Sequence, residues 1–460
     1  MRLVVIGVTV LDACVVAYAT LHFAINLVLV FISSRRIARD LRREQIKPAM
    51  ASAGDRFLPS ITLLVPAYNE EVTIVESLRS LLKLSYPAFE IVICNDGSKD
   101  KTVEVLLRSF DFVPVDIEHA DQLGCAAIRG CYEVRSALPA GLHRMVLIDK
   151  DNGGKADALN ACINLAQGDY VTSMDADSLL VPEALFKAAR VITGSQEPVV
   201  AVGAQVGLSN GSRVEDGKVV EMRLPTTWIA RFQIVEYMRS FAQGRVALSA
   251  LDSLLVLSGV FALMRRDLVV AIGGFLTKHM RSRVSVEYCG KGAHTVCEDM
   301  EIIVRLHRYL LDHGLPGKIT MLPFPTAWTE APENYRDLGK QRARWYRGLL
   351  EVLNYHRHII FRPRFRAIGL FALPYQVVFE AFSPVLELVG IAGLIGTLAL
   401  GMISGKALLT FLCLATAANL YLSTLSILMC ITGERAAGGP RSGLALFSYA
   451  HTRVSTTGAL

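Results

Sequence analysis

The stretch YVTSMDAD, residues 170–177, decides the fold of this chain. Its first five residues are the short β-branched and apolar run of a buried strand, and Asp175-Ala176-Asp177 follows directly. Carboxylates at positions i and i+2 after a strand point the same way, and hard oxygen ligands suit Mg²⁺ or Mn²⁺ bridging a diphosphate. D-x-D triplets are common by chance, and the alternative is a solvated turn with an aspartate capping a helix at Pro182. The position after a strand favours the metal site.

Two earlier strands are predicted to end in polar residues in the same way. Ile61–Val65 runs into PAYNEE (66–71), where Asn69 is predicted to cap a helix. Ile91–Cys94 runs into NDGS (95–98), and a helix is expected near Thr102 to Phe110.

A further strand, Met145–Ile148, ends in DKDNGGK (149–155), with a helix expected to reach Ala166. Strands that alternate with helices predict βαβ units, so we expect an α/β domain with a mainly parallel central sheet over residues 58–335. Ligands of such a sheet bind beyond the carboxyl ends of its strands. No G-x-G-x-x-G follows a strand, so a dinucleotide fold has little support.

The segment Asn152-Gly153-Gly154-Lys155 looks like a phosphate loop. It lacks the earlier glycine and the Ser/Thr of G-x-x-x-x-G-K-[ST], so the motif of an ATPase is not met. A lysine that opens a helix after two glycines can still meet a diphosphate, because backbone N–H groups and the positive helix end favour anions. A solvated loop is the alternative.

The segment TVCED, residues 295–299, has a structural and a catalytic interpretation. Thr295 and Glu298 match the capping box S/T-x-x-E ahead of an apolar-periodic helix. That explains Glu298 and leaves Asp299 without a structural task. A carboxylate at a helix start is a candidate general base if its surroundings raise its pKa.

Gln341, Arg344 and Trp345 stand at i, i+3 and i+4, so they share one face of a predicted helix. Arg344 is suited to phosphate oxygens, and Trp345 offers a flat apolar surface to a sugar ring. An amphipathic helix at a membrane interface also favours Arg and Trp. Both interpretations hold together.

The chain's 460 residues are 52% hydrophobic, with a mean hydropathy of +0.38, which predicts contact with lipid. Membrane-length apolar segments lie near both ends, and basic clusters border them. Such clusters indicate cytoplasmic flanks that meet anionic headgroups, so membrane lipids are expected as partners and nucleic acid is not. The nine cysteines include no C-x-x-C pair, which favours reduced thiols over a disulfide framework.

We therefore expect a multi-pass protein of the cell inner (plasma) membrane with its catalytic domain in the cytoplasm. The expected segments are 1–34 (transmembrane helix), 35–57 (basic cytoplasmic linker), 58–335 (α/β domain), 336–367 (amphipathic interface helices), 368–432 (C-terminal membrane helices) and 433–460 (a tail without a predicted element).

Together these motifs resemble the membrane-bound processive family 2 glycosyltransferases, which include cellulose, hyaluronan, chitin and poly-N-acetylglucosamine synthases. The resemblance rests on VPAYNEE (65–71), NDGS (95–98), NGGKADALN (152–160), DAD (175–177), SGVFALMRR (258–266), GGF (273–275), T-x-x-ED (295–299) and QRARW (341–345). It implies a GT-A fold, a nucleotide-sugar donor, a divalent metal (Mg²⁺ or Mn²⁺) and inversion at the anomeric carbon. The implied donor is a UDP-sugar such as UDP-N-acetylglucosamine or UDP-glucose, and the implied acceptor is a growing β-linked polysaccharide.

The resemblance also implies roles for individual residues. Asp299 would be the base, and Asp177 the metal ligand. The residues that would contact the nucleotide sugar are Tyr68, Glu70, Asp96, Lys155 and Asp175. The residues that would face the diphosphate and the acceptor are Glu298, Gln341, Arg344 and Trp345.

The sequence also departs from this family. Asn95 stands where the family often has Asp, which affects only the neighbour of Asp96. Few helices follow the catalytic part, and this weakens the prediction of processive export more than the prediction of catalysis. A transferase that adds one sugar to a lipid acceptor is the main alternative. A membrane transport or scaffold subunit with an inactive transferase domain is a second, and additional export or oligomer partners remain open.

Overall fold

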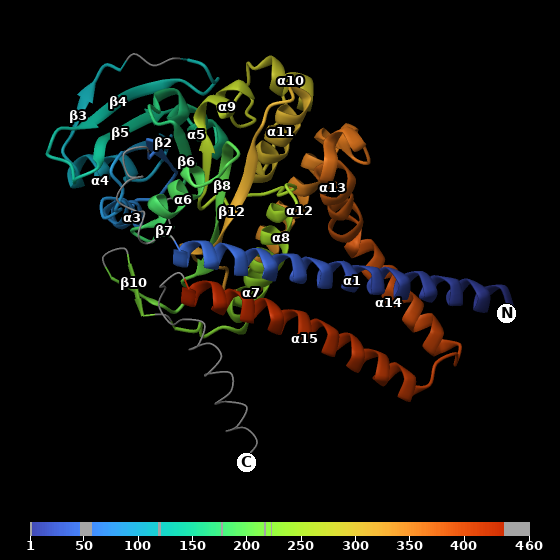
Figure 1. Cartoon of the computed structure of the whole chain (residues 1–460). Coiled ribbons are helices and arrows are strands. Elements are labelled where there is room, and N and C mark those ends of the chain that lie inside the picture. Colours follow the sequence, from blue (N-terminus) through green and yellow to red (C-terminus); the bar gives the residue numbers. More distant parts are fainter. Residues whose placement is uncertain are drawn as a thin grey trace.

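The computed structural model of the chain describes residues 2–46, 58–117, 121–175, 178–215, 218–221 and 223–436. An α/β domain sits at one end of two long helices, α1 (Arg2–Ile46) and α15 (Gly405–Ala436), which pack against each other (Figure 1). The N-terminus of α1 lies at the end remote from the α/β domain (Figure 1). The molecule is therefore divided into a globular part and a helical part, as the hydropathy pattern predicts.

The α/β domain is built on a ten-stranded sheet of order β3-β4-β5-β2-β1-β6-β11-β8-β12-β7. Its central strands β5, β2, β1 and β6 are parallel, as predicted, while β3, β4, β11 and β7 pair antiparallel with their neighbours, so the whole sheet is mixed. The strands are β1 (Ile61–Ala67), β2 (Phe89–Asp96), β3 (Phe112–Val115), β4 (Ile128–Val134), β5 (Leu142–Lys150), β6 (Tyr170–Ser173), β7 (Leu179–Leu180), β8 (Val199–Leu208), β11 (Ala262–Arg265) and β12 (Lys318–Thr329). A separate hairpin joins β9 (Arg213–Glu215) to β10 (Lys218–Glu221).

Helices cover the sheet and bury its apolar strands. Every residue of β2 is buried, the pattern of a strand covered on both faces. The helices of this domain are α3 (Ile74–Leu81), α4 (Thr102–Ser109), α5 (Lys155–Leu165), α6 (Ala184–Thr193), α9 (Arg266–Ala271), α10 (Arg283–Cys289) and α11 (Glu298–Asp312). The helix predicted at residues 102–110 and the one predicted to reach residue 166 are both confirmed.

The predicted cap at Asn69 is wrong. The helix after β1 begins only at Ile74, and Asn69 has a positive φ of 57°. Its side-chain oxygen accepts a hydrogen bond from the Lys99 N–H at 2.9 Å, while its own N–H donates to Ser98 at 2.9 Å. Asn69 therefore ties the end of β1 to the loop after β2, and its side chain is not free to cap a helix.

A second group of helices joins the sheet to the helical part. It comprises α7 (Trp228–Met238), the π-helix η3 (Arg239–Arg245), α8 (Val246–Ala250), α12 (Tyr335–Tyr355), η4 (Arg357–Ile359), η5 (Pro363–Phe365), η6 (Ile368–Ala372), α13 (Leu373–Tyr375), η7 (Gln376–Ala381) and α14 (Ser383–Ala399). Segment η3 packs against both α1 and α15, which brings it to the junction of the two parts.

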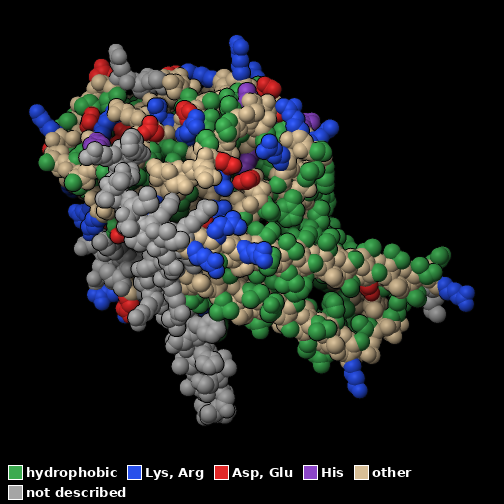
Figure 2. Space-filling view, in the orientation of Figure 1, with side chains coloured by type: hydrophobic (Ala, Val, Ile, Leu, Met, Phe, Trp, Pro, Cys, Tyr) green, Lys and Arg blue, Asp and Glu red, His purple; other side chains and the backbone are tan. Residues whose placement is uncertain are grey.

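Two helices are long and apolar enough to cross a membrane, Arg2–Asp40 and Gly405–Thr432. The pair Ile368–Ala381 and Ser383–Ala399 passes the same test jointly, with a bend of 45°. Hydrophobic side chains cover the long helices, and Lys and Arg side chains gather where these helices meet the α/β domain (Figure 2). Helix α1 does not end at residue 34 but continues to Ile46, so the first part of the predicted linker is helical. The rest of that linker, residues 47–57, and residues 437–460 of the predicted tail lie outside the described residues.

Candidate active site

The carboxyl ends of the parallel strands bring the predicted polar segments to one edge of the sheet. In the registers of these strands, Ala67 pairs with Asn95, and Asp96 pairs with Lys150. Tyr68 follows β1 and is 45% exposed. Glu70 also follows β1, and its carboxylate accepts a hydrogen bond from Thr73 at 2.5 Å.

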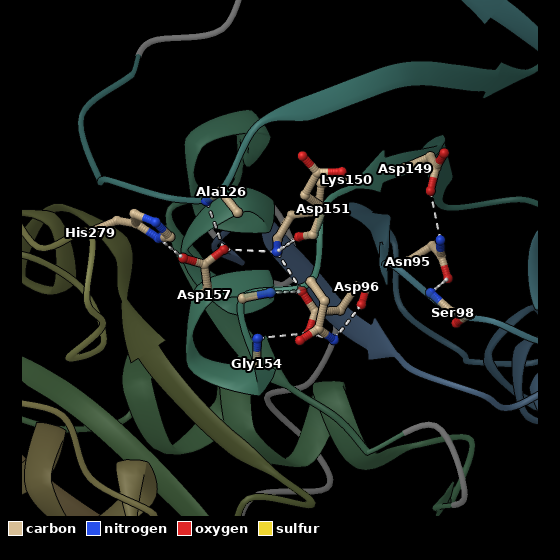
Figure 3. A network of polar contacts seen from close by, with 12 residues as sticks. Asn95, Asp96, Ser98, Ala126, Asp149, Lys150, Asp151, Gly154, Asp157 and His279 are labelled. Atoms are coloured by element: carbon tan, nitrogen blue, oxygen red, sulfur yellow. Dashed lines mark hydrogen bonds and ion pairs between the residues drawn. The ribbon is translucent and has the colours of Figure 1, made fainter.

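Asp96 is buried and holds the glycine loop that precedes α5 (Figure 3). Its carboxylate accepts hydrogen bonds from the backbone N–H of Gly153 at 2.9 Å and of Gly154 at 2.8 Å, and it is ion-paired with Lys150. Asn152 donates its side-chain amide to the Asp96 carbonyl at 2.8 Å. In this structure the Asp96 carboxylate therefore fixes the loop, while its predicted contact with a nucleotide remains a prediction.

Lys150 and Asp157 are residues of this region to which the sequence assigned no role. The Lys150 Nζ is fully buried and lies 2.7 Å from a carboxylate oxygen of Asp157. Asp157 also accepts a hydrogen bond from the Ala126 N–H at 2.9 Å and contacts His279 at 2.8 Å (Figure 3). Although burial acts to raise the pKa of Asp157, these hydrogen bonds hold that pKa below its usual value. The sequence pattern that could have identified the pair is a lysine at the end of a strand, followed by an aspartate in the first turn of the next helix.

Lys155 opens α5, as predicted, and it lies beside Asp175. Gly154 precedes it with a φ of +91°, a conformation that favours glycine. The Lys155 Nζ is ion-paired with Asp175 and lies 3.5 Å from a carboxylate oxygen of Glu298. A Cβ at Gly259 would lie 3.3 Å from this Nζ, so the glycine of the SGVF segment leaves room above the ion pair.

The predicted capping box at the start of α11 is wrong. The N-cap residue is Cys297, and no side chain caps the helix. The Thr295 hydroxyl accepts a hydrogen bond from the Cys297 N–H at 3.2 Å, and Glu298 reaches Lys155 instead. The N-terminus of α11 therefore places Glu298 and Asp299 in the site.

Asp299 has the shifted pKa that a general base requires. Burial, and then the like charge of Glu298, raise its pKa to about 6, while Lys155 and Arg245 oppose the shift. One of its oxygens accepts a hydrogen bond from the Met300 N–H at 2.9 Å. Asp299 is therefore a buried carboxylate whose surroundings favour its protonated form more than water does.

Gln341, Arg344 and Trp345 lie on the single helix α12, as predicted. The chain packs α12 against the start of α11, since a Cβ at Gly348 would lie 2.3 Å from the Cys297 sulfur. Arg342 ties the same helix to α7 through Glu236, and the Tyr346 hydroxyl donates to the Ala381 carbonyl at 2.7 Å. These contacts fix the helix that carries Trp345.

A cleft of about 1710 Å³ joins these groups. The predicted site residues that line it are Lys155, Asp175, Glu298, Asp299, Gln341, Arg344 and Trp345. The cleft continues to the helical part, where residues of α1 and α15 line it. Tyr68, Glu70 and Asp96 do not line it among the described residues, and Asp177 lies outside them.

The chemistry of the cleft fits a divalent cation. Asp175, Glu298 and Asp299 provide three carboxylates around the ammonium of Lys155. Such hard oxygen donors are the ligands that Mg²⁺ and Mn²⁺ prefer.

Comparison with known proteins identifies relatives of this chain. A poly-β-1,6-N-acetyl-D-glucosamine synthase of Staphylococcus aureus (strain COL) is 27% identical over 300 residues, a match that covers 64% of this chain and 56% of the relative. The synthase of the same name from Staphylococcus epidermidis is 27% identical over 296 residues, with coverages of 64% and 55%. The chain thus spans about half the length of the curated relatives that it matches.

Among solved structures, the mannosyltransferase PcManGT from Pyrobaculum calidifontis, in complex with GDP-Man and Mn²⁺, is similar with a TM-score of 0.54 at 19% identity. The similarity covers 91% of this chain and 97% of that one, and it confirms the GT-A type of fold. Residues 59–348, more than half of the chain, match the family described as "Glycosyltransferase like family 2". This protein is a glycosyltransferase and belongs to family 2.

Proposed function

We propose that this protein is an inverting membrane transferase that moves a sugar from a UDP-sugar onto a growing β-linked polysaccharide. The observation that carries the proposal is the cleft, in which Asp299 faces the same space as the Lys155–Asp175 pair and the Gln341–Trp345 face of α12. Donor-binding and acceptor-binding groups thus meet at one carboxylate with a pKa of about 6.

In the proposed reaction, Asp299 accepts the proton of an acceptor hydroxyl. The hydroxyl oxygen then bonds to the anomeric carbon of the donor sugar as the bond from that carbon to the diphosphate oxygen breaks. Direct displacement from the opposite side inverts the anomeric centre. The cationic side chains Lys155 and Arg344, which line the cleft, stabilise the negative charge that develops on the diphosphate.

Asp175 and Asp177 are the residues proposed to hold a divalent metal, Mg²⁺ or Mn²⁺. A bound metal ion would supply charge stabilisation to the leaving diphosphate. The Mn²⁺ complex of the similar mannosyltransferase supports this part of the proposal.

The name of the staphylococcal relatives supports UDP-N-acetylglucosamine as the first donor to test, with UDP-glucose as the second. A single transfer to a lipid acceptor is the alternative, and the continuation of the cleft between α1 and α15 supports it. The pKa and position of Asp299 argue against an inactive domain that serves only transport or scaffolding.

The test uses the purified full-length chain in nanodiscs, incubated with labelled UDP- and GDP-sugars in turn. Product size is measured by gel electrophoresis and mass spectrometry. We expect incorporation from one UDP-sugar into a polymer and none with Asp299→Asn. A product that carries one sugar on lipid would select the alternative, and incorporation by Asp299→Asn at the wild-type rate would reject the site.

We also propose a multi-pass position in the cell inner membrane with the α/β domain in the cytoplasm. The spans at both ends of the chain and the basic side chains beside them support this placement. A cysteine introduced at Lys101 should escape an impermeant thiol reagent added to intact cells and react after permeabilisation. Labelling of this cysteine in intact cells would show that the α/β domain lies outside the cytoplasm, opposite to the proposed orientation.

A further inference from the structure

Two nitrogens of the Arg245 guanidinium have no hydrogen-bond partner within the described part of the chain, although the side chain lines the cleft. Its Nε and Nη1 atoms are buried and have no hydrogen-bond partner among the described residues. The side chain lines the cleft and packs over the Phe241 ring, with 4.2 Å from the guanidinium carbon to the ring centroid. Buried donors are almost always paired in native proteins, so an unpaired guanidinium in a cleft indicates a ligand acceptor group.

The segment that carries Arg245 is held firmly at the membrane side of the site. The carbonyl of Gln243 accepts a hydrogen bond from Ser33 of α1 at 2.9 Å, and its side-chain oxygen accepts one from Ser426 of α15 at 3.0 Å. The Gln243 amide also donates to Asn26 of α1. Arg245 therefore stands at the end of a π-helix that is clamped to both long helices, and π-helical turns are frequent at functional sites.

Arg245 belongs to a different element from the groups assigned to the donor. The donor diphosphate has Lys155 at the start of α5 and Arg344 on α12, whereas Arg245 comes from η3. Asp299, the proposed base, is the carboxylate whose charge acts on Arg245, yet the two form no ion pair within 4.0 Å. Gln341 Oε1 is also buried in this cleft without a hydrogen-bond donor among the described residues, which leaves a place for a substrate hydroxyl.

The cleft beyond Arg245 is mixed in character. On α15 it is lined by Leu412, Ala415, Thr416, Asn419, Leu420 and Ser423. Such a lining accepts either an alkyl chain or a sugar chain, and none of these α15 side chains carries a charge that could select between them. Arginine binds phosphate and carboxylate through paired N–H donors, more strongly than it binds neutral oxygens.

We propose that Arg245 binds an oxyanion of the acceptor, a phosphate or a carboxylate, on the membrane side of Asp299. This inference rests on the transferase activity of the proposed function. It favours an acceptor that carries an anion, either a phosphorylated lipid or an acidic sugar chain, over a chain built only of neutral sugars. A lipid phosphate and an acidic sugar share the required chemistry, and the probes below distinguish them.

The experiment measures binding to the full-length protein in nanodiscs without turnover, so its outcome is independent of whether transfer is observed. The probes are farnesyl phosphate against farnesol, and a glucuronic acid disaccharide against its neutral glucose counterpart. We expect one anionic probe to bind about 10- to 100-fold more tightly than its neutral partner, the worth of a charge-assisted hydrogen bond. The pair that shows this preference identifies the source of the oxyanion.

Arg245→Gln should abolish the preference, and Arg245→Lys should keep part of it. Arg108→Gln is the matched control, because the Arg108 side chain is 79% exposed on α4. UDP affinity should be equal in all four proteins. If neither anionic probe is preferred by the wild type, or if the preference survives Arg245→Gln, the proposal is overturned. A loss of UDP affinity in Arg245→Gln equal to the loss of probe affinity would move Arg245 to the donor side and overturn it as well.

Should Arg245→Gln fail to fold, Arg245→Lys takes its place: a preference for the anionic probe as strong as that of the wild type would overturn the proposal, and a partial loss would support it. Folding is checked by the unfolding temperature of each variant against that of Arg108→Gln.

Discussion

The ammonium of Lys150 is fully buried between two carboxylates, ion-paired with Asp96 and 2.7 Å from Asp157. Through Asp96 it supports the loop that ends at Gly154, and through Asp157 it supports the first turn of α5. Lys155 follows in the same turn, so a buried charge cluster fixes the helix start that is proposed to meet the diphosphate. The donor side of the site is thus positioned by groups that do not line the cleft.

We expect Lys150→Met to lower the free energy of unfolding by about 3–5 kcal/mol, because it leaves two buried carboxylates without their cation. Unfolding of the full chain in detergent, followed by circular dichroism, measures the change. Lys101→Met removes a surface lysine and should change it by less than about 0.5 kcal/mol. Equal stability of the two variants would show that the cluster does not hold the loop.

Asp299→Asn should reduce turnover by roughly 10²–10⁴-fold, the usual worth of a general base, because an amide cannot accept the acceptor's proton. UDP-sugar affinity should stay near the wild-type value, since Lys155 and Arg344 are retained. Single-turnover kinetics and calorimetry on the same preparation give the two numbers. Asp267→Asn, at a side chain that is 62% exposed, controls for loss of a surface aspartate. A loss of donor binding or folding in Asp299→Asn would make Asp299 a structural residue.

The pattern of strands and acids predicted the centre of the domain because it depends on local sequence. The strands predicted ahead of PAYNEE, NDGS, DKDNGGK and DAD all form, and the first three continue two residues into these segments. Four parallel strands bring their ends to one edge. The antiparallel flanks were not predicted, since strand direction there depends on which distant segments meet.

The same limit explains why the predicted capping role of Glu298 is wrong. Its spacing from Thr295 fits a capping box, but Lys155, far away in the sequence, attracts its carboxylate. No local pattern marks Arg245, which is proposed to bind an anion because two of its buried nitrogens have no hydrogen-bond partner among the described residues.

The pH dependence of activity should follow Asp299, whose pKa is raised to about 6 mainly by burial and then by Glu298. The base acts when deprotonated, so kcat/KM should be full above this pKa and fall about tenfold per pH unit below it. Glu298→Gln removes the like charge, which should move the acidic limb to lower pH. A pH series of initial rates for both proteins tests this. If the acidic limb stays in place or moves to higher pH, Glu298 is excluded as a cause of the raised pKa of Asp299.

Metal removal should abolish turnover, because Asp175 and Asp177 are proposed to hold the cation that the diphosphate needs. Activity is measured in excess EDTA and after Mg²⁺ or Mn²⁺ is restored. The same treatment of Asp177→Ala should find little activity to restore, and Mn²⁺ should bind this variant more weakly in electron paramagnetic resonance titrations with UDP present. Full activity in chelator would remove the metal from the proposal.

Trp345→Ala should impair use of the acceptor while it leaves the chemistry of the donor intact. Trp345 lines the cleft on the same face of α12 as Gln341 and Arg344. The guanidinium carbon of Arg342 lies 4.8 Å from the centroid of the Trp345 ring. Removing this apolar surface should raise the KM for acceptor about 10- to 100-fold, the equivalent of one buried large side chain. UDP-sugar affinity and the pH profile should not change, because Lys155 and Asp299 remain.

Trp345→Phe retains a flat ring and should recover most of the loss, which separates stacking from polar contacts of the indole. Trp228→Ala is the control, since this tryptophan is 67% exposed on α7 and does not line the cleft. Acceptor kinetics and product length are compared across the four proteins. If Trp345→Ala lowers donor affinity instead, the ring faces the diphosphate and the assignment of this helix face to the acceptor is wrong.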